Sequence, residues 1–143
     1  MKKYTIGIDF GTLSGRCLLA DVETGEEIAT SVLEYRHRVM SETLPDGTRL
    51  GVDWHLQHPG DYLDVLRITI RDVIKQAEIR PEQVIGIGID TTGCTILPIK
   101  KDGTPLCFLE RWKGSPNAYV KLWKHHAAQP YACLLYTSPS PRD

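Results

Sequence analysis

Residues 4–21 read YTIGIDFGTLSGRCLLAD, and this stretch decides the fold of the chain. It predicts an apolar strand over residues 4–9, a tight polar turn, and a second apolar strand over residues 16–21. An acid ends the first strand and an arginine begins the second. The backbone N–H groups and small hydroxyls of such a turn can bind phosphate, and a nearby carboxylate can hold Mg²⁺. An ordinary hairpin, in which glycine and serine only make the turn, explains this stretch equally well.

The composition is that of a soluble globular domain. The chain has 143 residues, of which 41% are hydrophobic and 24% are charged, and 17 basic and 18 acidic residues give a net charge of −1. This length can bury a core. The balanced charge argues against nucleic acid or an anionic membrane as a partner, and no apolar run approaches transmembrane length. The four cysteines lack C-x-x-C spacing, which predicts reduced thiols in a cytoplasmic protein.

The next part of the chain predicts an α/β layout. Residues 27–35 complete a three-stranded meander, and residues 44–48 predict a hairpin tip or loop. Pro59 stands at a first helical position, and apolar residues at helical spacing continue to about Ala77. Residues 84–90 alternate isoleucine with glycine. This pattern predicts a central strand, buried on both faces and parallel to the first, with a helix packed closely on its glycines.

Two further elements are expected in the last third of the chain. Residues 95–99 and 105–108 predict a hairpin with Asp102-Gly103 at its turn. Residues 117–129 predict a second helix that ends at the proline after them.

Two acids are expected to meet at one edge of the sheet. Asp9 and Asp90 end strands that we expect to be parallel, and open α/β sheets bind their ligands outside the carboxyl ends of such strands. This placement favours phosphate binding over an ordinary hairpin. Asp90 itself is expected to cap a turn or order water rather than to act in catalysis.

Histidines, cysteines and tryptophans give weaker signals. The pairs His55/His58 and His125/His126 lack an acidic or cysteine partner at metal-site spacing, which argues against a histidine metal site. Cys94 is expected to be a small buried thiol. The three tryptophans are expected to pack in the core or on the surface rather than to stack on a ligand.

Over about residues 1–129 the chain resembles the FGGY family of carbohydrate kinases, and within it the kinases that act on L-ribulose. The matching segments are residues 7–12 (GIDFGT) through Arg16, 45–49 (PDGTR), 56–63 (LQHPGDYL), 85–98 (IGIGIDTTGCTILP) and 117–126 (NAYVKLWKHH). The first segment alone marks the wider superfamily of sugar kinases, actin and heat-shock ATPases. The later segments favour the L-ribulose kinases.

The resemblance implies a ribonuclease-H-like N-terminal domain from an enzyme whose two domains close on ATP, Mg²⁺ and a sugar. Asp9 would hold Mg²⁺, directly or through water. The nucleotide phosphates would be lined by Gly11, Thr12, Leu13 and Ser14, with Arg16 offsetting their charge. Thr92, Gly93 and Cys94 would face the sugar. Leu13 stands where the family usually has a polar residue, so only its backbone N–H could take part.

Family members are several times longer, so the resemblance implies that residues 1–130 are part of the first domain. The general base and most of the adenine pocket would lie in the missing part, and the fragment is expected to be inactive and to fold poorly alone. Residues 131–143 match nothing in the family and are expected to be a non-native, disordered tail.

The expected activity is ATP-dependent phosphorylation of L-ribulose to L-ribulose 5-phosphate, as in L-arabinose catabolism. The partners would be ATP and the sugar, with a homo-oligomer as an option for the full-length enzyme. Two alternatives stay open: an FGGY kinase for xylulose, fuculose or glycerol, and an actin-like or heat-shock-like nucleotide-binding module without kinase activity.

Overall fold

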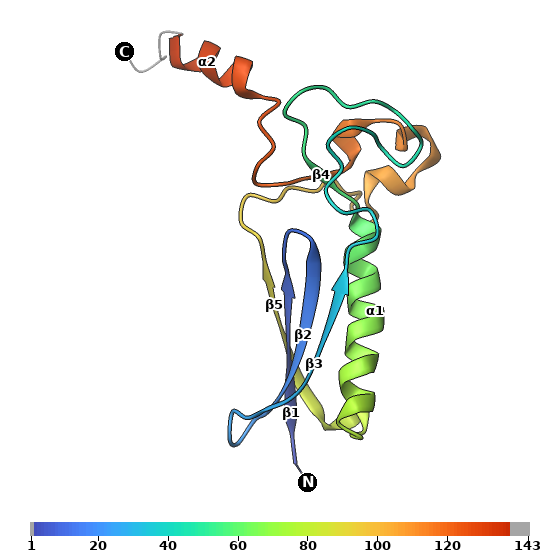
Figure 1. Cartoon of the computed structure of the whole chain (residues 1–143), viewed down its shortest axis with the longest axis vertical. Helices are drawn as coiled ribbons and strands as arrows, with labels where there is room; N and C mark the ends of the chain where they lie inside the picture. Colours follow the sequence, from blue (N-terminus) through green and yellow to red (C-terminus); the bar gives the residue numbers. More distant parts are fainter. Residues whose placement is uncertain (1, 138–143) are drawn as a thin grey trace.

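A four-stranded mixed sheet with strand order β3-β2-β1-β5 forms the centre of the computed structural model, which describes residues 2–137 (Figure 1). β1 (Tyr4–Phe10), β2 (Ser14–Asp21) and β3 (Glu27–Glu34) form an antiparallel meander. β5 (Val84–Thr91) runs parallel to β1. The predicted order of meander, helix and parallel strand is confirmed, and so is the mixed α/β class.

α1 (Pro59–Gln76) covers one face of this sheet (Figure 1). As predicted, proline opens the helix. Asp61 lies in its first turn, where a negative charge suits the helix dipole. His58 is the N-cap, and its Nδ1 accepts a hydrogen bond of 3.1 Å from the Gly60 N–H. The helix therefore has both a side-chain cap and a proline to fix where it begins.

The main core lies between α1 and the sheet. Alternate side chains of β1 and β2 point toward the helix, as the two-residue period of a strand requires. The buried members of this core are Tyr4, Ile6, Ile8, Phe10, Cys17, Leu19, Tyr35, Val65 and Val73. α1 approaches the sheet closely at Gly15, where an added Cβ would lie 2.6 Å from the Val65 methyl groups. Glycine there lets helix and sheet meet.

A smaller unit lies beyond the carboxyl ends of β1 and β5 (Figure 1). β4 (Leu56–Gln57) pairs antiparallel with β6 (Val120–Lys121). Its own core is formed by Met40, Leu44, Leu56, Cys107, Ala118 and Tyr119. Short 3₁₀ helices occupy the connections: η1 (Pro81–Gln83), η2 (Leu106–Phe108), η3 (Glu110–Trp112) and η4 (Pro116–Ala118). The predicted hairpin tip at residues 44–48 is confirmed by the Leu44 N–H, which donates to the Thr48 carbonyl at 2.8 Å.

The prediction that residues 84–90 form a central strand buried on both faces is wrong. β5 is an edge strand, and the exposed fractions of Ile85, Ile87 and Ile89 are 57%, 57% and 62%. α1 packs mainly over β2 and β3, and no described strand pairs with the outer edge of β5. The expected helix on its glycines is also absent from the described residues, because no atom lies within 4 Å of a Cβ built on Gly88.

Two predictions for the last third also need correction. Residues 117–129 form no single helix, since Val120 and Lys121 pair with β4 instead. The hairpin over residues 95–108 is reduced to one bridge between Ile99 and Pro105. Its predicted turn is confirmed, with Gly103 at a φ of +83° and its N–H donating to the Lys100 carbonyl at 2.9 Å. In residues 117–129, pairing of β6 with β4, which is distant in the sequence, therefore prevails over the local helical pattern.

The expected tail begins as a helix rather than as disordered chain. α2 (Gln129–Thr137) projects away from the sheet, with Pro130 in its first turn, where a missing N–H costs little (Figure 1). Its side chains Tyr131, Leu134 and Leu135 are 63–78% exposed. Residues 138–143 of that expected tail lie outside the described residues. None of the helices within residues 2–137 combines the length and apolar character needed to cross a membrane.

Candidate active site

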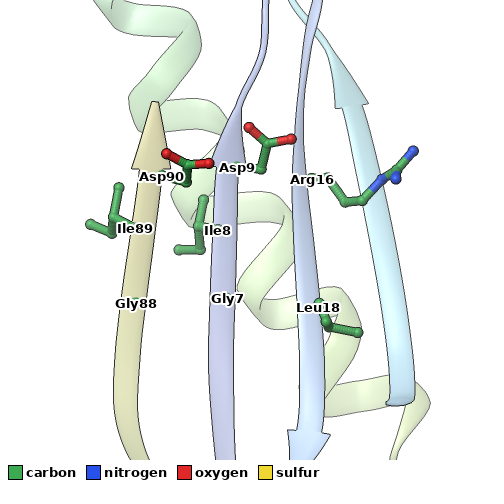
Figure 2. A pocket seen from close by; sticks show the side chains of 8 residues that line it. All are labelled: Gly7, Ile8, Asp9, Arg16, Leu18, Gly88, Ile89 and Asp90. Atoms are coloured by element: carbon green, nitrogen blue, oxygen red, sulfur yellow. The ribbon is translucent and has the colours of Figure 1, made fainter. Parts of the chain in front are cut away.

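Asp9 and Asp90 lie next to each other at the carboxyl ends of two parallel strands, as the sequence predicted. They are register partners on β1 and β5, and both side chains lie on the sheet face opposite α1 (Figure 2). The Oδ1 of Asp90 also accepts the Thr91 N–H at 2.9 Å, a contact between consecutive residues of β5, and the expected turn-capping role stays a prediction. Two neighbouring carboxylates repel each other unless a cation lies between them, and their oxygens are the hard ligands that Mg²⁺ prefers. The donor set therefore fits Mg²⁺.

A groove of about 390 Å³ runs along this open face below the two carboxylates (Figure 2). It is lined by Gly7, Ile8, Asp9, Arg16, Leu18, Gly88, Ile89 and Asp90. Gly7 and Gly88 are register partners, so the floor of the groove carries no side chain at that level. A ligand or another part of a protein could approach the backbone closely there.

Arg16 lies opposite Asp9 in the β1–β2 register, but its side chain points away from both carboxylates and toward β3 (Figure 2). Within the described residues it forms no ion pair. In this position its guanidinium does not neutralise Asp9. Its predicted role near the phosphates stays a prediction and would require another rotamer.

The predicted phosphate turn is shorter than the sequence suggested. Ser14 already belongs to β2, so the turn comprises residues 11–13. The Gly11 N–H donates to the Ser14 carbonyl at 2.9 Å, and the Tyr35 N–H donates to the Leu13 carbonyl at 2.8 Å. The Leu13 side chain is apolar and 58% exposed, so at this position only the backbone can contact a phosphate.

Sequence reasoning missed the residues that support this turn from behind. Gln57 of β4 is 1% exposed, and its Nε2 lies 2.8 Å from the Thr12 carbonyl oxygen and 3.4 Å from that of Gly11. The Tyr62 hydroxyl donates to Gln57 Oε1 at 2.6 Å. The indole N–H of Trp123 donates to the Thr12 hydroxyl at 3.3 Å. Gln57 stands two residues before the proline that opens α1, and a polar residue at that position was the available signal for it.

The residues expected to face the sugar follow β5 but do not act as one surface. Thr92 lies beside a cavity of about 190 Å³, also lined by Phe10, Tyr62, Thr91, Thr95, Leu97 and Val120. The Thr92 and Thr95 hydroxyls are 2.9 Å apart, so each can hydrogen-bond the other. Gly93 and Cys94 form an exposed turn, with a φ of +58° at Cys94. The expectation that Cys94 is buried is wrong, because this turn carries it out of the sheet.

A cluster of His37, His58 and Asp61 lies at the start of α1, and it was not predicted from the sequence. The ligand atoms of the three lie within 4.8 Å of one another, so His58 does have an acidic neighbour. The two rings stack with centroids 4.1 Å apart, and His37 Nδ1 lies 2.7 Å from Asp61 Oδ1. Burial lowers the pKa of His58, and a charge on His37 lowers it further. These contacts tie residue 37 to the helix start.

The chain is similar to known sugar kinases in both sequence and fold. The profile of the FGGY family of carbohydrate kinases, N-terminal domain, matches residues 4–130. A ribulokinase from Shouchella clausii is 58% identical over 130 residues, which is 90% of this chain and 23% of that protein. A ribulokinase from Staphylococcus aureus is 38% identical over 133 residues, 93% of this chain and 24% of that protein. The chain thus spans about a quarter of the length of the relatives it matches.

Solved structures show the same fold at low identity. A gluconate kinase from Lactobacillus acidophilus superposes with a TM-score of 0.71 at 17% identity, covering 95% of this chain and 23% of that one. A ligand-bound xylulose kinase from the same species gives a TM-score of 0.69 at 17% identity, covering 94% and 22%. The architecture is therefore that of the N-terminal part of sugar kinases.

Proposed function

The chain belongs to the FGGY family of carbohydrate kinases, and we propose that it supplies the phosphate-binding part of an ATP-dependent kinase that converts L-ribulose to L-ribulose 5-phosphate. The observation that carries this proposal is the 58% identity to a ribulokinase over nearly the whole chain. The site supports it, because a pair of carboxylates and a glycine-containing turn meet at one end of the sheet.

We assign the magnesium site to Asp9, with Asp90 beside it. Bound there, Mg²⁺ would neutralise charge on the transferring phosphoryl group. The chain's own contribution is to hold two carboxylates at fixed positions on adjacent strands. Thr12 and Leu13 would offer backbone N–H groups to the phosphate oxygens. These groups require no side-chain charge, so the leucine in the turn does not prevent phosphate binding.

For the sugar we assign the loop that follows β5. The Thr92 and Thr95 hydroxyls hydrogen-bond each other at 2.9 Å, and a sugar hydroxyl could replace that partner. The exposed Gly93-Cys94 turn would contact the sugar mainly through its backbone. The site then places sugar and nucleotide at the same end of the sheet, which in-line transfer requires.

The proposed enzyme needs more than residues 1–130. No described residue in the groove is placed to take a proton from a sugar hydroxyl once Asp9 and Asp90 hold Mg²⁺, and we assign the general base to the part that this chain does not share with its longer relatives. The chain alone is expected to be inactive. We infer a cytoplasmic enzyme that uses ATP and Mg²⁺.

The test uses a chimera in which residues 1–130 replace the aligned segment of the Shouchella clausii ribulokinase. We expect L-ribulose-dependent ADP release with a preference for L-ribulose over D-xylulose. In this chimera Asp9→Asn should lower kcat by about a hundredfold or more, because it removes a carboxylate that positions charge in the transition state. L-ribulose affinity should change less than about twofold, since binding of the sugar in its ground state does not depend on that charge.

Asp64→Asn is the matched control, because it removes an acid from the exposed side of α1. It should leave both kcat and sugar affinity unchanged. A folded chimera that binds nucleotide but phosphorylates no sugar would instead favour the nucleotide-binding module. Unchanged turnover in the folded Asp9→Asn chimera would overturn the assignment of Asp9.

A further inference from the structure

The amide of Gln57 uses its hydrogen-bonding groups within the protein interior. Its Nε2 donates to the Thr12 carbonyl at 2.8 Å and lies 3.4 Å from the Gly11 carbonyl. Its Oε1 accepts the Tyr62 hydroxyl at 2.6 Å. Leaving either end of a buried amide unpaired would be costly, so a side chain that is 1% exposed and bonded at both ends has a fixed orientation.

Both ends of that amide have a partner that fixes the orientation. The carbonyls of residues 11 and 12 can only accept, so the NH₂ group faces them, and the Tyr62 hydroxyl then holds the other end by donating to Oε1. The Tyr62 ring is held by Phe10 and Tyr35, with ring centroids 5.2 Å and 5.6 Å away. Burial raises the pKa of Tyr62 to about 12, which keeps its hydroxyl protonated as a donor.

Holding a carbonyl also fixes the N–H of the following residue. In a planar trans peptide the C=O and the N–H point in opposite directions. The peptides that carry the Gly11 and Thr12 carbonyls end in the N–H groups of Thr12 and Leu13, and both are trans. Gln57 therefore turns these two N–H groups away from the interior. Within the described residues they donate to no protein acceptor.

A second contact holds the same turn from another segment. The Trp123 indole N–H donates to the Thr12 hydroxyl at 3.3 Å, and Trp123 follows β6, the partner strand of β4. The turn is thus contacted by β4 itself and by the segment that follows β6. The rest of the turn rests on β2 and on the backbone of Tyr35.

We propose that Gln57, held by Tyr62, is a positioning residue for nucleotide binding: it holds the Gly11 and Thr12 carbonyls so that the Thr12 and Leu13 N–H groups face the phosphates. This inference rests on the proposed function and deepens it. Gln57 does not touch the nucleotide. It acts by setting the directions of two peptide groups before the ligand arrives, which lowers the cost of ordering them.

The experiment measures MgADP binding by calorimetry, and ATP kinetics, in the chimera described above. Gln57→Met keeps the side-chain volume and removes the amide. We expect it to weaken MgADP binding and lower kcat/KM for ATP by about tenfold to a hundredfold, as misplaced binding groups do, with the KM for L-ribulose within about twofold. Tyr62→Phe keeps the ring and removes the hydroxyl, and its effect on ADP should be smaller and in the same direction.

Thr69→Val is the control for a general loss of stability. It removes a fully buried hydroxyl that donates to the Val65 carbonyl at 2.7 Å, about two helical turns along α1 from Tyr62. It should lower the melting temperature without changing ADP affinity. Gln57→Glu, which keeps the acceptor for Tyr62 but removes the donor, should resemble Gln57→Met.

The outcomes separate this inference from the proposed function. If the unsubstituted chimera folds but binds no nucleotide, both fail. If it is an active kinase and Gln57→Met binds MgADP as well as the parent, only the positioning role fails. Equal losses of ADP affinity in Gln57→Met and Thr69→Val would reduce Gln57 to a stability role and also overturn the inference.

Discussion

β1 and β5 are neighbours in one sheet, yet their isoleucines differ completely in exposure. Ile6 and Ile8 of β1 are 1% and 2% exposed, whereas their register partners Ile87 and Ile89 on β5 are 57% and 62% exposed. The residue type is the same and the residues are register partners, so the difference in exposure arises from what covers each strand. α1 packs over the meander and reaches β1, and it does not cover β5. A strand rich in isoleucine can be buried, but it is buried only where a neighbouring element packs on it.

The largest test of this comparison truncates one isoleucine on each strand in the 143-residue chain. Ile6→Ala should lower the free energy of unfolding by about 2–5 kcal/mol, because it opens a cavity in a filled core. Ile87→Ala should cost less than about 0.5 kcal/mol, as expected for an exposed site. Urea unfolding followed by circular dichroism measures both. Equal costs would show that β5 is covered in solution.

Two glycines test the same contrast between the covered and the open parts of the sheet, with changes in stability of intermediate size. An added Cβ at Gly15 would lie 2.6 Å from the Val65 methyl groups, whereas one at Gly88 would meet nothing within 4 Å. Gly15→Ala should destabilise by about 1–3 kcal/mol through overpacking. Gly88→Ala should be neutral or stabilise by up to about 1 kcal/mol, because it restricts the unfolded chain. The melting temperatures of the two variants should therefore shift in opposite directions, and a loss at Gly88 would contradict the open face.

The start of α1 gives a pH-dependent test on the covered side. Burial lowers the pKa of His58, and the charge of His37 lowers it further against the opposing effect of Asp61 and Asp64. The unfolded chain then binds more protons than the folded one just below pH 6.5, so this contribution to stability is complete above that pH and is lost as the pH falls. His58→Asn keeps an N-cap and removes the titration.

Its stability should therefore decrease less between pH 7 and about 5.5 than that of the parent, measured by urea unfolding at each pH. His125 also has a pKa lowered by burial, so the free energy of unfolding of the variant should still decrease somewhat as the pH falls. An unchanged slope in His58→Asn would assign the pH dependence to other groups.

The smallest effect on stability is expected at the open edge. Ile87→Lys places a charge on an edge strand that is already exposed, and such charges are a common way to prevent strand pairing between molecules. We expect the parent chain to self-associate and the variant to do so at higher concentration, as measured by sedimentation velocity. Val32→Lys, at a site 51% exposed on the opposite edge strand, is the control and should change association less.

Features that depend on residues close together in the sequence were predicted well, and features that depend on distant residues were not. The meander and α1 follow from local periodicity and from Pro59, and they were predicted closely. The adjacency of Asp9 and Asp90 was predictable because parallel strands bring their carboxyl ends together. Burial of β5 was not, since it depends on neighbours that the described residues do not supply.

The side-chain contacts that support the site could not be predicted for the same reason. Gln57 contacts carbonyls 45 and 46 residues away, and Asp61 contacts His37 across 24 residues. No local pattern encodes such pairs. The helix expected over residues 117–129 failed because pairing of β6 with β4 satisfies the backbone better than an isolated helix would.

The parallel pairing of β1 with β5 also has a consequence for how the chain folds. Tyr4 pairs with Val84, so forming this ladder closes a loop of about 80 residues, at an entropic cost of about 4 kcal/mol from chain length alone. The β1–β2 and β2–β3 hairpins close much shorter loops. We therefore expect the meander to form before β5 docks, and the two carboxylates of the site to meet only in the last, slowest step of folding.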